Sequence, residues 1–161
     1  MTQEIEMNFK VTNKKGLLAF LRRRADEKVS EIKMTYFDRK NDDSFYIRIE
    51  EIKENGRERR FLTAKGGFGS ENGINKKKEV SIPITEGTQQ YIDFLLIVGM
   101  KPDGSKQKIR HYFKIDGLEI TLDEWNVEEL GDRLEIEGKS ENKIKQFSRR
   151  VVQFCDPNPS R

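Results

Sequence analysis

The sequence predicts an α+β fold, in which an eight-stranded antiparallel β-barrel (a tunnel) has a polar, charged lumen and helices packed on its outside. Three observations lead to this prediction. Eight segments alternate between apolar and polar residues, as strands with one apolar face do. Three other segments carry apolar residues at helical spacing. The polar faces of the strands are mostly charged, with few Ser, Thr or Gln residues among them.

The predicted strands lie at 3–11, 30–38, 44–53, 58–65, 76–84, 107–115, 118–124 and 132–138. Turn signals separate several of them. Asn55-Gly56 and Asp116-Gly117 are typical of tight hairpins. Gly66-Gly67-Phe68-Gly69 predicts a looser loop, and Pro102-Asp103-Gly104 predicts a turn.

The predicted helices lie at 14–27, at 88–98 and from 140 to about 154. Asn13 and Ser140 are suitable N-caps for the first and the third, and Gly99 offers an end to the second. Each helix has an apolar side that needs a surface to cover, and the apolar faces of the strands supply one. We expect residues 1–155 to form a single domain and 156–161 to form a flexible tail.

Composition limits the class of protein. Charged residues make up 37% of the 161 residues and hydrophobic ones 34%, but the apolar residues fall in ordered runs, which predicts a folded chain. The net charge of +3 is too close to balance to predict a nucleic-acid partner. Cys155 is the only cysteine, so an internal disulfide is excluded. No signal segment or membrane-spanning stretch is seen, so we expect a cytoplasmic protein without a membrane partner.

The alternating strands have two interpretations. In the simpler one, a sheet has one buried and one solvated face, and its charges are only hydrated. In the other, the sheet closes, the apolar faces lie beneath the helices and the charges line a lumen. Enclosed charges must pair or bind ions and ligands. The three amphipathic segments and the charged polar faces favour the closed barrel, with one site for a cation and an anion together.

Acidic residues on these inner faces form two pairs, Glu4 with Glu6 and Glu135 with Glu137. The carboxylates of each pair lie about 7 Å apart along one strand. Asp123 joins them from a neighbouring hairpin strand. Mg²⁺ and Mn²⁺ prefer oxygen ligands and often bind through carboxylates together with substrate phosphates. The acidic residues therefore predict a site for a divalent metal ion.

Basic residues on the same faces predict an anion site. Arginine binds phosphate with two parallel hydrogen bonds, whereas lysine acts as a point charge. Taken singly, each basic residue has the alternative interpretation of a surface ion pair. The basic candidates are Arg48, Lys65, Lys108 and Arg110, with Lys10 and Lys77 as additions.

In order and spacing, these segments resemble the CYTH, or triphosphate tunnel metalloenzyme, superfamily. That family opens with an E-x-E-x-K strand, here Glu4-Ile5-Glu6-Met7-Asn8. It closes with an acid, here Asp123, and then L-G-x-x-x-E-x-E, here at 130–137. Between these ends lie Tyr36-Phe37-Asp38, an arginine strand at 46–49, a lysine strand at 61–66 and a basic strand at 108–112.

The resemblance implies a tunnel that acts on a triphosphate with Mg²⁺ or Mn²⁺, as class IV adenylate cyclases, thiamine triphosphatases and inorganic tripolyphosphatases do. It implies that the phosphates are bound by Arg48, Lys65, Lys108 and Arg110, with Lys77 near the arginine of the family's R-x-E-x-E strand. Glu79 corresponds to an acid of that strand. The implied metal-binding acids are Glu4, Glu6, Asp123, Glu135, Glu137 and Glu79.

This sequence also departs from the family pattern. The family lysine of the first strand is Asn8, the second arginine of an R-x-R pair is Glu50, and Ser81 replaces a second acid. We expect Lys10, on the same strand face as Asn8, to take over from the missing lysine, which makes Asn8 and Lys10 the candidate catalytic positions. Alternatively, nothing replaces it, and the protein binds a triphosphate but turns it over slowly.

Three further side chains have a packing interpretation. His111 falls on the apolar face of its strand and is expected to pack there. Trp125 and Phe68 could stack a base, but packing in the core or in a loop is the expected role.

The leading functional hypothesis is metal-dependent hydrolysis of tripolyphosphate, thiamine triphosphate or a nucleoside triphosphate. One alternative is a class IV-type adenylate cyclase, in which the ribose 3′-hydroxyl attacks the α-phosphorus of ATP. Another is a non-catalytic binder of polyphosphate or nucleotide, which the loss of lysine at Asn8 favours. We expect a monomer or a homodimer.

Overall fold

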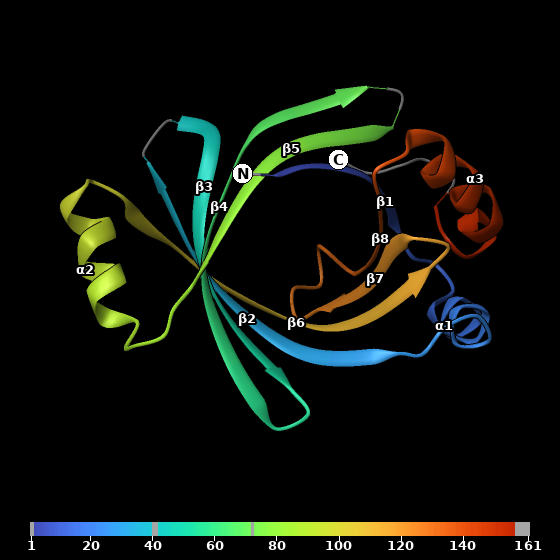
Figure 1. Ribbon diagram of the computed structural model, residues 1–161, viewed down its shortest axis with the longest axis horizontal. Coiled ribbons are helices and arrows are strands. Elements are labelled where there is room, and N and C mark those ends of the chain that lie inside the picture. Colours follow the sequence, from blue (N-terminus) through green and yellow to red (C-terminus); the bar gives the residue numbers. More distant parts are fainter. Residues whose placement is uncertain (1, 40–41, 72, 157–161) are drawn as a thin grey trace.

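A closed antiparallel barrel forms the body of the protein, as the sequence predicts (Figure 1). The computed structural model describes residues 2–39, 42–71 and 73–156. Around the barrel the strands follow the order β1-β5-β4-β3-β2-β6-β7-β8. The strands are β1 (Thr2–Lys10), β2 (Lys28–Arg39), β3 (Asp42–Glu54), β4 (Arg57–Glu71), β5 (Ile74–Pro83), β6 (Lys101–Ile115), β7 (Leu118–Trp125) and β8 (Asp132–Glu137).

Three helices lie outside the barrel, which confirms the three helical segments. They are α1 (Lys14–Arg22), α2 (Gln89–Ile97) and α3 (Glu141–Val151), and a short 3₁₀ turn (Val152–Phe154) follows α3. Asn13 caps α1 by accepting a hydrogen bond from the Gly16 backbone N–H at 2.9 Å. Ser140 caps α3 in the same way through the Lys143 N–H. None of the helices in the described ranges is long and apolar enough to span a membrane.

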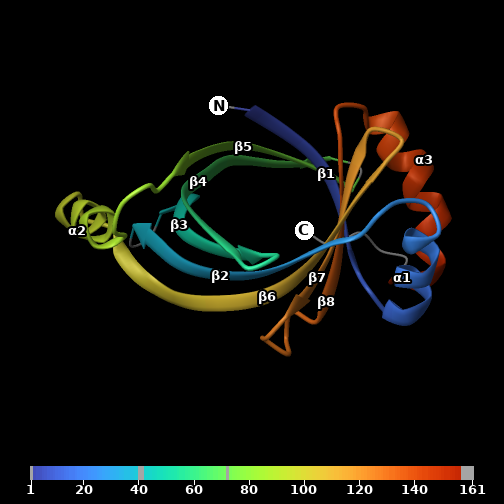
Figure 2. The ribbon, with the colours of Figure 1, turned by 60° about the horizontal axis from the view of Figure 1, so that its bottom comes forward.

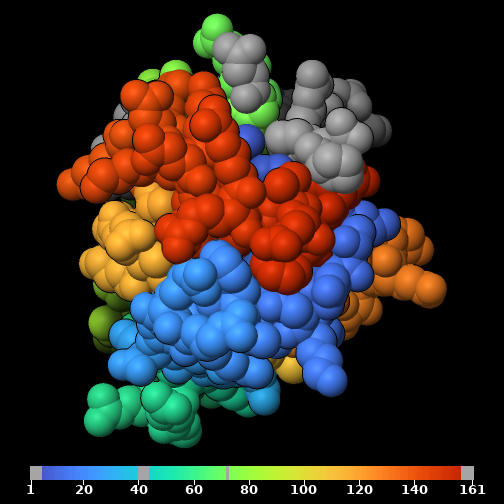
Figure 3. All heavy atoms as spheres, turned by 90° about the vertical axis from the view of Figure 1, so that its right-hand side faces the viewer, coloured from blue at the N-terminus to red at the C-terminus, as the bar shows by residue number. Residues whose placement is uncertain are grey.

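The main core lies between the barrel and two of these helices. Figures 2 and 3 show α1 and α3 side by side on one flank of the barrel. Beneath them lie the outward side chains of β1, β7 and β8, and each large apolar side chain buried in this way contributes about 1.5–3 kcal/mol. Fully or almost fully buried members include Phe9, Leu17, Leu21, Ile120, Leu122, Leu134, Ile136, Ile144 and Phe147.

A second, smaller core holds α2 at the opposite end of the molecule (Figure 2). Leu95 is the buried residue of this helix, and it packs with Phe37, Ile49, Ile84 and Met100. Because the outer faces of the strands supply both cores, the charged faces point into the barrel.

Two predicted connections are wrong, because their residues continue strands. The segment 66–69 stays in β4, where Lys65 lies opposite Glu79 and Gly69 lies opposite Lys76, so β4 carries one extra residue. Residues 102–104 lie in β6 and pair with β2 beside another irregularity in register. Proline is tolerated there because it pairs next to this irregularity, close to the start of the strand. The chain instead turns just after α2, at Gly99, whose φ of +87° suits glycine.

The two ends of the predicted segments also need adjustment. Helix α1 ends at Arg22, five residues before the predicted end at 27. Of the predicted tail at 156–161, Asp156 is described, and its backbone N–H donates a hydrogen bond to the Lys10 carbonyl oxygen at 2.8 Å. Residues 157–161 lie outside the described part of the chain.

Candidate functional site

A cavity of about 530 Å³ lies inside the barrel, and side chains from all eight strands line it. Among the residues that the structure describes, its wall contains seven acidic and six basic side chains, so their charges nearly balance. The acidic ones are Glu6, Glu50, Glu79, Glu119, Asp123, Glu135 and Glu137, and the basic ones are Arg48, Lys65, Lys77, Lys108, Arg110 and Arg133. A cavity lined in this way suits a ligand that brings both a cation and several negative charges.

Three carboxylates converge on one point of this cavity. One oxygen from each of Glu6, Glu135 and Glu137 lies within 4.8 Å of the other two. The pairing of β1 with β8 produces this arrangement, since Glu6 lies opposite Glu137 and Asn8 lies opposite Glu135. Three carboxylate oxygens at this separation fit a hard divalent cation such as Mg²⁺ or Mn²⁺.

Two acids of this group, Glu6 and Glu135, have pKa values that are shifted in opposite directions. Burial, together with the negative charge of Glu135, raises the pKa of Glu6 above its ordinary value. Burial also disfavours the charged form of Glu135, but Lys77 and Arg110 outweigh it and lower the pKa of that carboxyl. A divalent cation would relieve the repulsion that raises the pKa of Glu6.

Glu6 already has two polar neighbours. Lys77 Nζ of β5 lies 2.5 Å from Glu6 Oε2, and Asn8 Nδ2 donates a hydrogen bond to Glu6 Oε1 at 3.0 Å. The structure therefore places an amine from β5 next to Glu6. The backbone of Glu4 in β1 pairs with that of Lys77 in β5, but the Glu4 side chain lies outside the described part of the chain.

Lys10 is not brought to this cavity. It shares a strand face with Asn8, as the alternation predicts, but it is the last residue of β1 and its side chain is exposed. Asn8 lines the cavity and Lys10 does not. The position of Lys10 thus does not support its expected replacement of the family lysine.

Asp123 has cations as its partners. Its carboxylate accepts two hydrogen bonds from Arg110, each 2.7 Å long, and Lys108 Nζ lies 2.6 Å away. Burial alone would raise the pKa of Asp123, but Arg110 and Lys108 hold it at about 2. The three-carboxylate group of Glu6, Glu135 and Glu137 does not include Asp123.

Lys108 and Arg110 share the carboxylate of Asp123, and of these two cations only Lys108 has a lowered pKa. Burial, and next the charge of Arg110, lower the pKa of Lys108 to about 8, against the opposing effect of Asp123. The pKa of Arg110 is raised, because Asp123 outweighs its burial. Arg110 therefore keeps its charge, and Lys108 becomes the more weakly charged member of the pair.

The other predicted phosphate ligands also face the cavity, each next to an acid. Arg48 lies 2.7 Å from Glu50, and Lys65 forms an ion pair with Glu79. Glu79, predicted among the metal acids, lies with Lys65 and outside the three-carboxylate group. Glu50, noted in the sequence as a departure from an arginine, is the counter-ion of Arg48.

Sequence reasoning missed several residues of the cavity wall. Tyr36, Tyr46 and Arg133 line it, although none was a candidate site residue. The signal was present in the alternation, because Tyr46 precedes Arg48 by two positions and Arg133 precedes Glu135 by two.

Trp125 and His111, both predicted to pack, also contact charged side chains. Trp125 lies in the cavity wall, where Lys108 Nζ lies 4.7 Å from the centre of its ring. His111 is buried on the outer face, as expected. There its Nδ1 lies 2.6 Å from Glu27 and its Nε2 lies 2.7 Å from Glu124, so it links two carboxylates.

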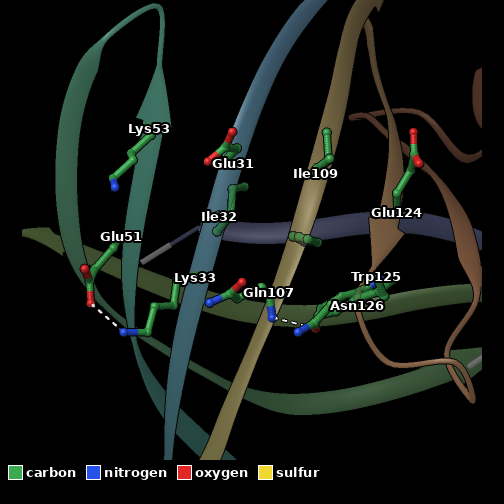
Figure 4. Close-up of a pocket in the computed structure, with 11 residues that line it drawn as sticks. Glu31, Ile32, Lys33, Glu51, Lys53, Gln107, Ile109, Glu124, Trp125 and Asn126 are labelled. Atoms are coloured by element: carbon green, nitrogen blue, oxygen red, sulfur yellow. Dashed lines mark hydrogen bonds and ion pairs between the residues drawn. The ribbon is translucent and has the colours of Figure 1, made fainter.

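A second cavity, of about 510 Å³, is bounded by residues of β3, β2, β6 and β7, and it shares Ile32, Lys108 and Trp125 with the wall of the barrel cavity (Figure 4). Glu31 and Lys33 of β2 point into it, and Lys33 lies 3.9 Å from Glu51. Such exposed pairs contribute little. Among its described residues no group of three acids could hold a metal ion, so the barrel cavity is the better candidate site.

Comparison with known proteins places this fold in a defined family. The model of the CYTH domain family matches residues 2–150. No curated protein matches the sequence. The three solved structures described next share between 12% and 24% identity with this chain, so their likeness shows the fold alone.

Three of these solved structures are representative. A Pyrococcus horikoshii protein has a TM-score of 0.74 and 24% identity, over 93% of this chain and 86% of its own. A chain of the Schizosaccharomyces pombe Mediator head module has a TM-score of 0.78 and 12% identity, over 96% and 97%. A Hippeastrum protein considered an adenylyl cyclase, in which triphosphatase activity dominates, has a TM-score of 0.72 and 16% identity, over 93% and 86%.

Proposed function

Because this chain belongs to the CYTH domain family, we propose that it hydrolyses a phosphoanhydride bond of a triphosphate inside its barrel, with Mg²⁺ or Mn²⁺. One observation carries the proposal. Glu6, Glu135 and Glu137 converge within 4.8 Å in the same cavity that Arg48, Lys65, Lys77, Lys108 and Arg110 line. Metal and polyanion would therefore be bound next to each other.

The three-carboxylate group would hold the metal ion, with Glu4 as a further candidate from the same strand face. A bound Mg²⁺ or Mn²⁺ supplies neutralisation of phosphate charge in such a site. Between Glu6 and Glu135, the pKa is raised for Glu6 and lowered for Glu135, so Glu135 ionises more readily than Glu6 in the free protein.

The basic residues would bind the phosphate oxygens and stabilise the charge that develops on the leaving group. In the free protein each of them is held by an acid, as Arg48 is by Glu50 and Arg110 is by Asp123. These pairs keep the cations oriented in a buried site, and phosphate oxygens can add to or replace the carboxylates as partners. Arg110, whose pKa is raised, stays charged throughout.

The test is incubation of the purified protein with tripolyphosphate, thiamine triphosphate and ATP, each with Mg²⁺ or Mn²⁺ and each with a chelator. Metal-dependent release of phosphate supports the proposal. Cyclic AMP with pyrophosphate as the product of ATP would replace it by the cyclase alternative. Binding without turnover would identify a non-catalytic binder, the alternative that Asn8 favours.

Lys77, rather than Lys10, is expected to compensate for the lysine that Asn8 replaces. Lys77→Ala should lower the rate of phosphate release about 100-fold, because its amine lies beside Glu6 within the charged cavity. Lys10→Ala, the matched control on an exposed lysine, should stay close to the wild-type rate. Circular dichroism shows whether each variant is folded.

A second substitution separates loss of the amine from loss of structure. The double variant Asn8→Lys/Lys77→Ala returns an amine to the cavity from β1 and should recover part of the lost rate. A large loss in Lys10→Ala, with an indifferent Lys77→Ala, would show that the sequence-based expectation for Lys10 is right after all.

A further inference from the structure

An aromatic stack adjoins the barrel cavity. Tyr36 and Tyr46 line the cavity, with their ring centres 5.8 Å apart. The ring of Phe68 lies over that of Tyr46, with centres 5.9 Å apart and planes only 13° from parallel. Phe68 remains 49% exposed. Three rings thus extend from the cavity wall to the solvent.

The extra residue in β4 brings Phe68 to the cavity side. In a regular strand, residues 65 and 68 point to opposite faces. Four steps along β4, from Lys65 to Gly69, correspond to three steps along β5, from Glu79 to Lys76. This bulge shifts the alternation, so Phe68 comes to the face that carries Lys65 and meets the ring of Tyr46.

The glycines around Phe68 permit this geometry. Gly67 has a φ of +63°, which side chains other than that of glycine rarely adopt. A Cβ atom on Gly66 would lie 3.0 Å from Phe45 Cβ and 3.1 Å from the Ser44 carbonyl oxygen. The segment 66–69 therefore positions a half-exposed phenylalanine, and does not simply connect two strands.

The stack also lies next to the basic part of the cavity. Tyr46 is directly opposite Lys65 in the pairing of β3 with β4, and it precedes Arg48 by two residues on the same strand face. A ligand whose phosphates contact Lys65 and Arg48 would have its remaining part beside Tyr46 and Phe68. A flat ring stacks well on such a surface, because stacking needs only a π-face.

We infer that Phe68 and Tyr46 form a subsite for a planar aromatic group attached to the triphosphate. The inference rests on the proposed function, and it narrows the substrate class to organic triphosphates, in preference to inorganic tripolyphosphate. A nucleoside triphosphate and thiamine triphosphate share this chemistry, since both join a heteroaromatic ring to a phosphate chain.

Isothermal titration calorimetry with Mg²⁺ tests the subsite. The quantity compared is the ratio of the affinity for an organic triphosphate to the affinity for tripolyphosphate. The probes are ATP, thiamine triphosphate and tripolyphosphate, and the proteins are wild type, Phe68→Ala and Phe68→Trp. Phe68→Ala should lower the affinity for the preferred organic triphosphate about 5- to 150-fold relative to tripolyphosphate. Phe68→Trp should preserve the ratio. Phe94→Ala, which removes an exposed phenylalanine from α2, is the matched control and should not change it.

Each outcome decides the matter. Tighter binding of ATP or of thiamine triphosphate identifies which ring the stack accepts. If tripolyphosphate binds as tightly as both, or if Phe68→Ala leaves the ratio unchanged, the subsite is refuted while the proposed function stands. If none of the three probes binds, the proposed function fails and this inference fails with it.

Discussion

Replacement of Glu135 by glutamine is expected to lower metal-dependent turnover at least about 100-fold. The change keeps the size of the side chain but removes the charge that would hold a divalent cation. Substitution of a residue that only hydrogen-bonds to a metal ligand typically lowers metal affinity or activity about 10- to 100-fold. Loss of a ligand itself should lower activity at least as much. The measurement is phosphate release at limiting Mg²⁺ or Mn²⁺.

Folding should survive this substitution. Glu135 contributes to the repulsion that raises the pKa of Glu6, and its neutral replacement relieves that repulsion. Glu137→Gln should behave in the same way, because its carboxylate belongs to the same group. Glu51→Gln removes a carboxylate that lines the second cavity and lies outside the three-carboxylate group, and it serves as the control. Full activity of both Glu135→Gln and Glu137→Gln at limiting metal would refute the assigned metal site.

The second large effect is on stability. Asp123→Asn should lower the free energy of unfolding of the ligand-free protein by about 3–5 kcal/mol, because it leaves two enclosed cations without their carboxylate. Lys108 is 7% exposed and Asp123 5%. Urea denaturation measures the loss. Asp116→Asn, which alters an exposed acid 3.7 Å from Arg150, is the control and should change stability little.

The pH dependence of stability provides a check on the same carboxylate. The pKa of Asp123 is about 2 in the folded protein, below its ordinary value of 3.8. Its contribution, about 2 kcal/mol, is therefore present above pH 4 and lost as the pH falls towards 2. The difference between wild type and Asp123→Asn should narrow over that range. A difference that is absent at neutral pH would show that Asp123 does not act as the counter-ion.

Alternation carried most of what the sequence could predict. Phe9 faces the core while Glu6 and Asn8 face the cavity, because a period of two assigns every residue of a regular strand to one side. The helices followed from their apolar spacing and from the caps at Asn13 and Ser140. The charged lumen could be inferred because the helices needed the apolar faces of the strands as a surface to cover, which left the charged faces to line the interior of the barrel.

Alternation within one strand predicts neither the register between strands nor which residues of a strand lie at the level of the site. Lys10 has the correct parity, but it lies at the end of β1, and the amine beside Glu6 comes from Lys77 on a strand distant in sequence. Asp123 was grouped with the other acids by charge, whereas its partners were set by its position opposite Arg110 in the pairing of β6 with β7. The bulge in β4 shifts the alternation of side chains, so the sequence pattern did not predict the side on which Phe68 lies.

Thermal unfolding with Mg²⁺ and tripolyphosphate, added separately and together, is the most direct measurement of whether the lumen is one joint site for metal and triphosphate. A joint site predicts that the pair stabilises the protein more than either component alone. The total stabilisation relative to the ligand-free protein should be about 2.7 kcal/mol at a free ligand concentration 100 times the Kd. In Glu135→Gln the part that depends on metal should disappear. Millimolar tripolyphosphate with Mg²⁺ that leaves the melting temperature unchanged would contradict the joint site and favour charges that are merely hydrated.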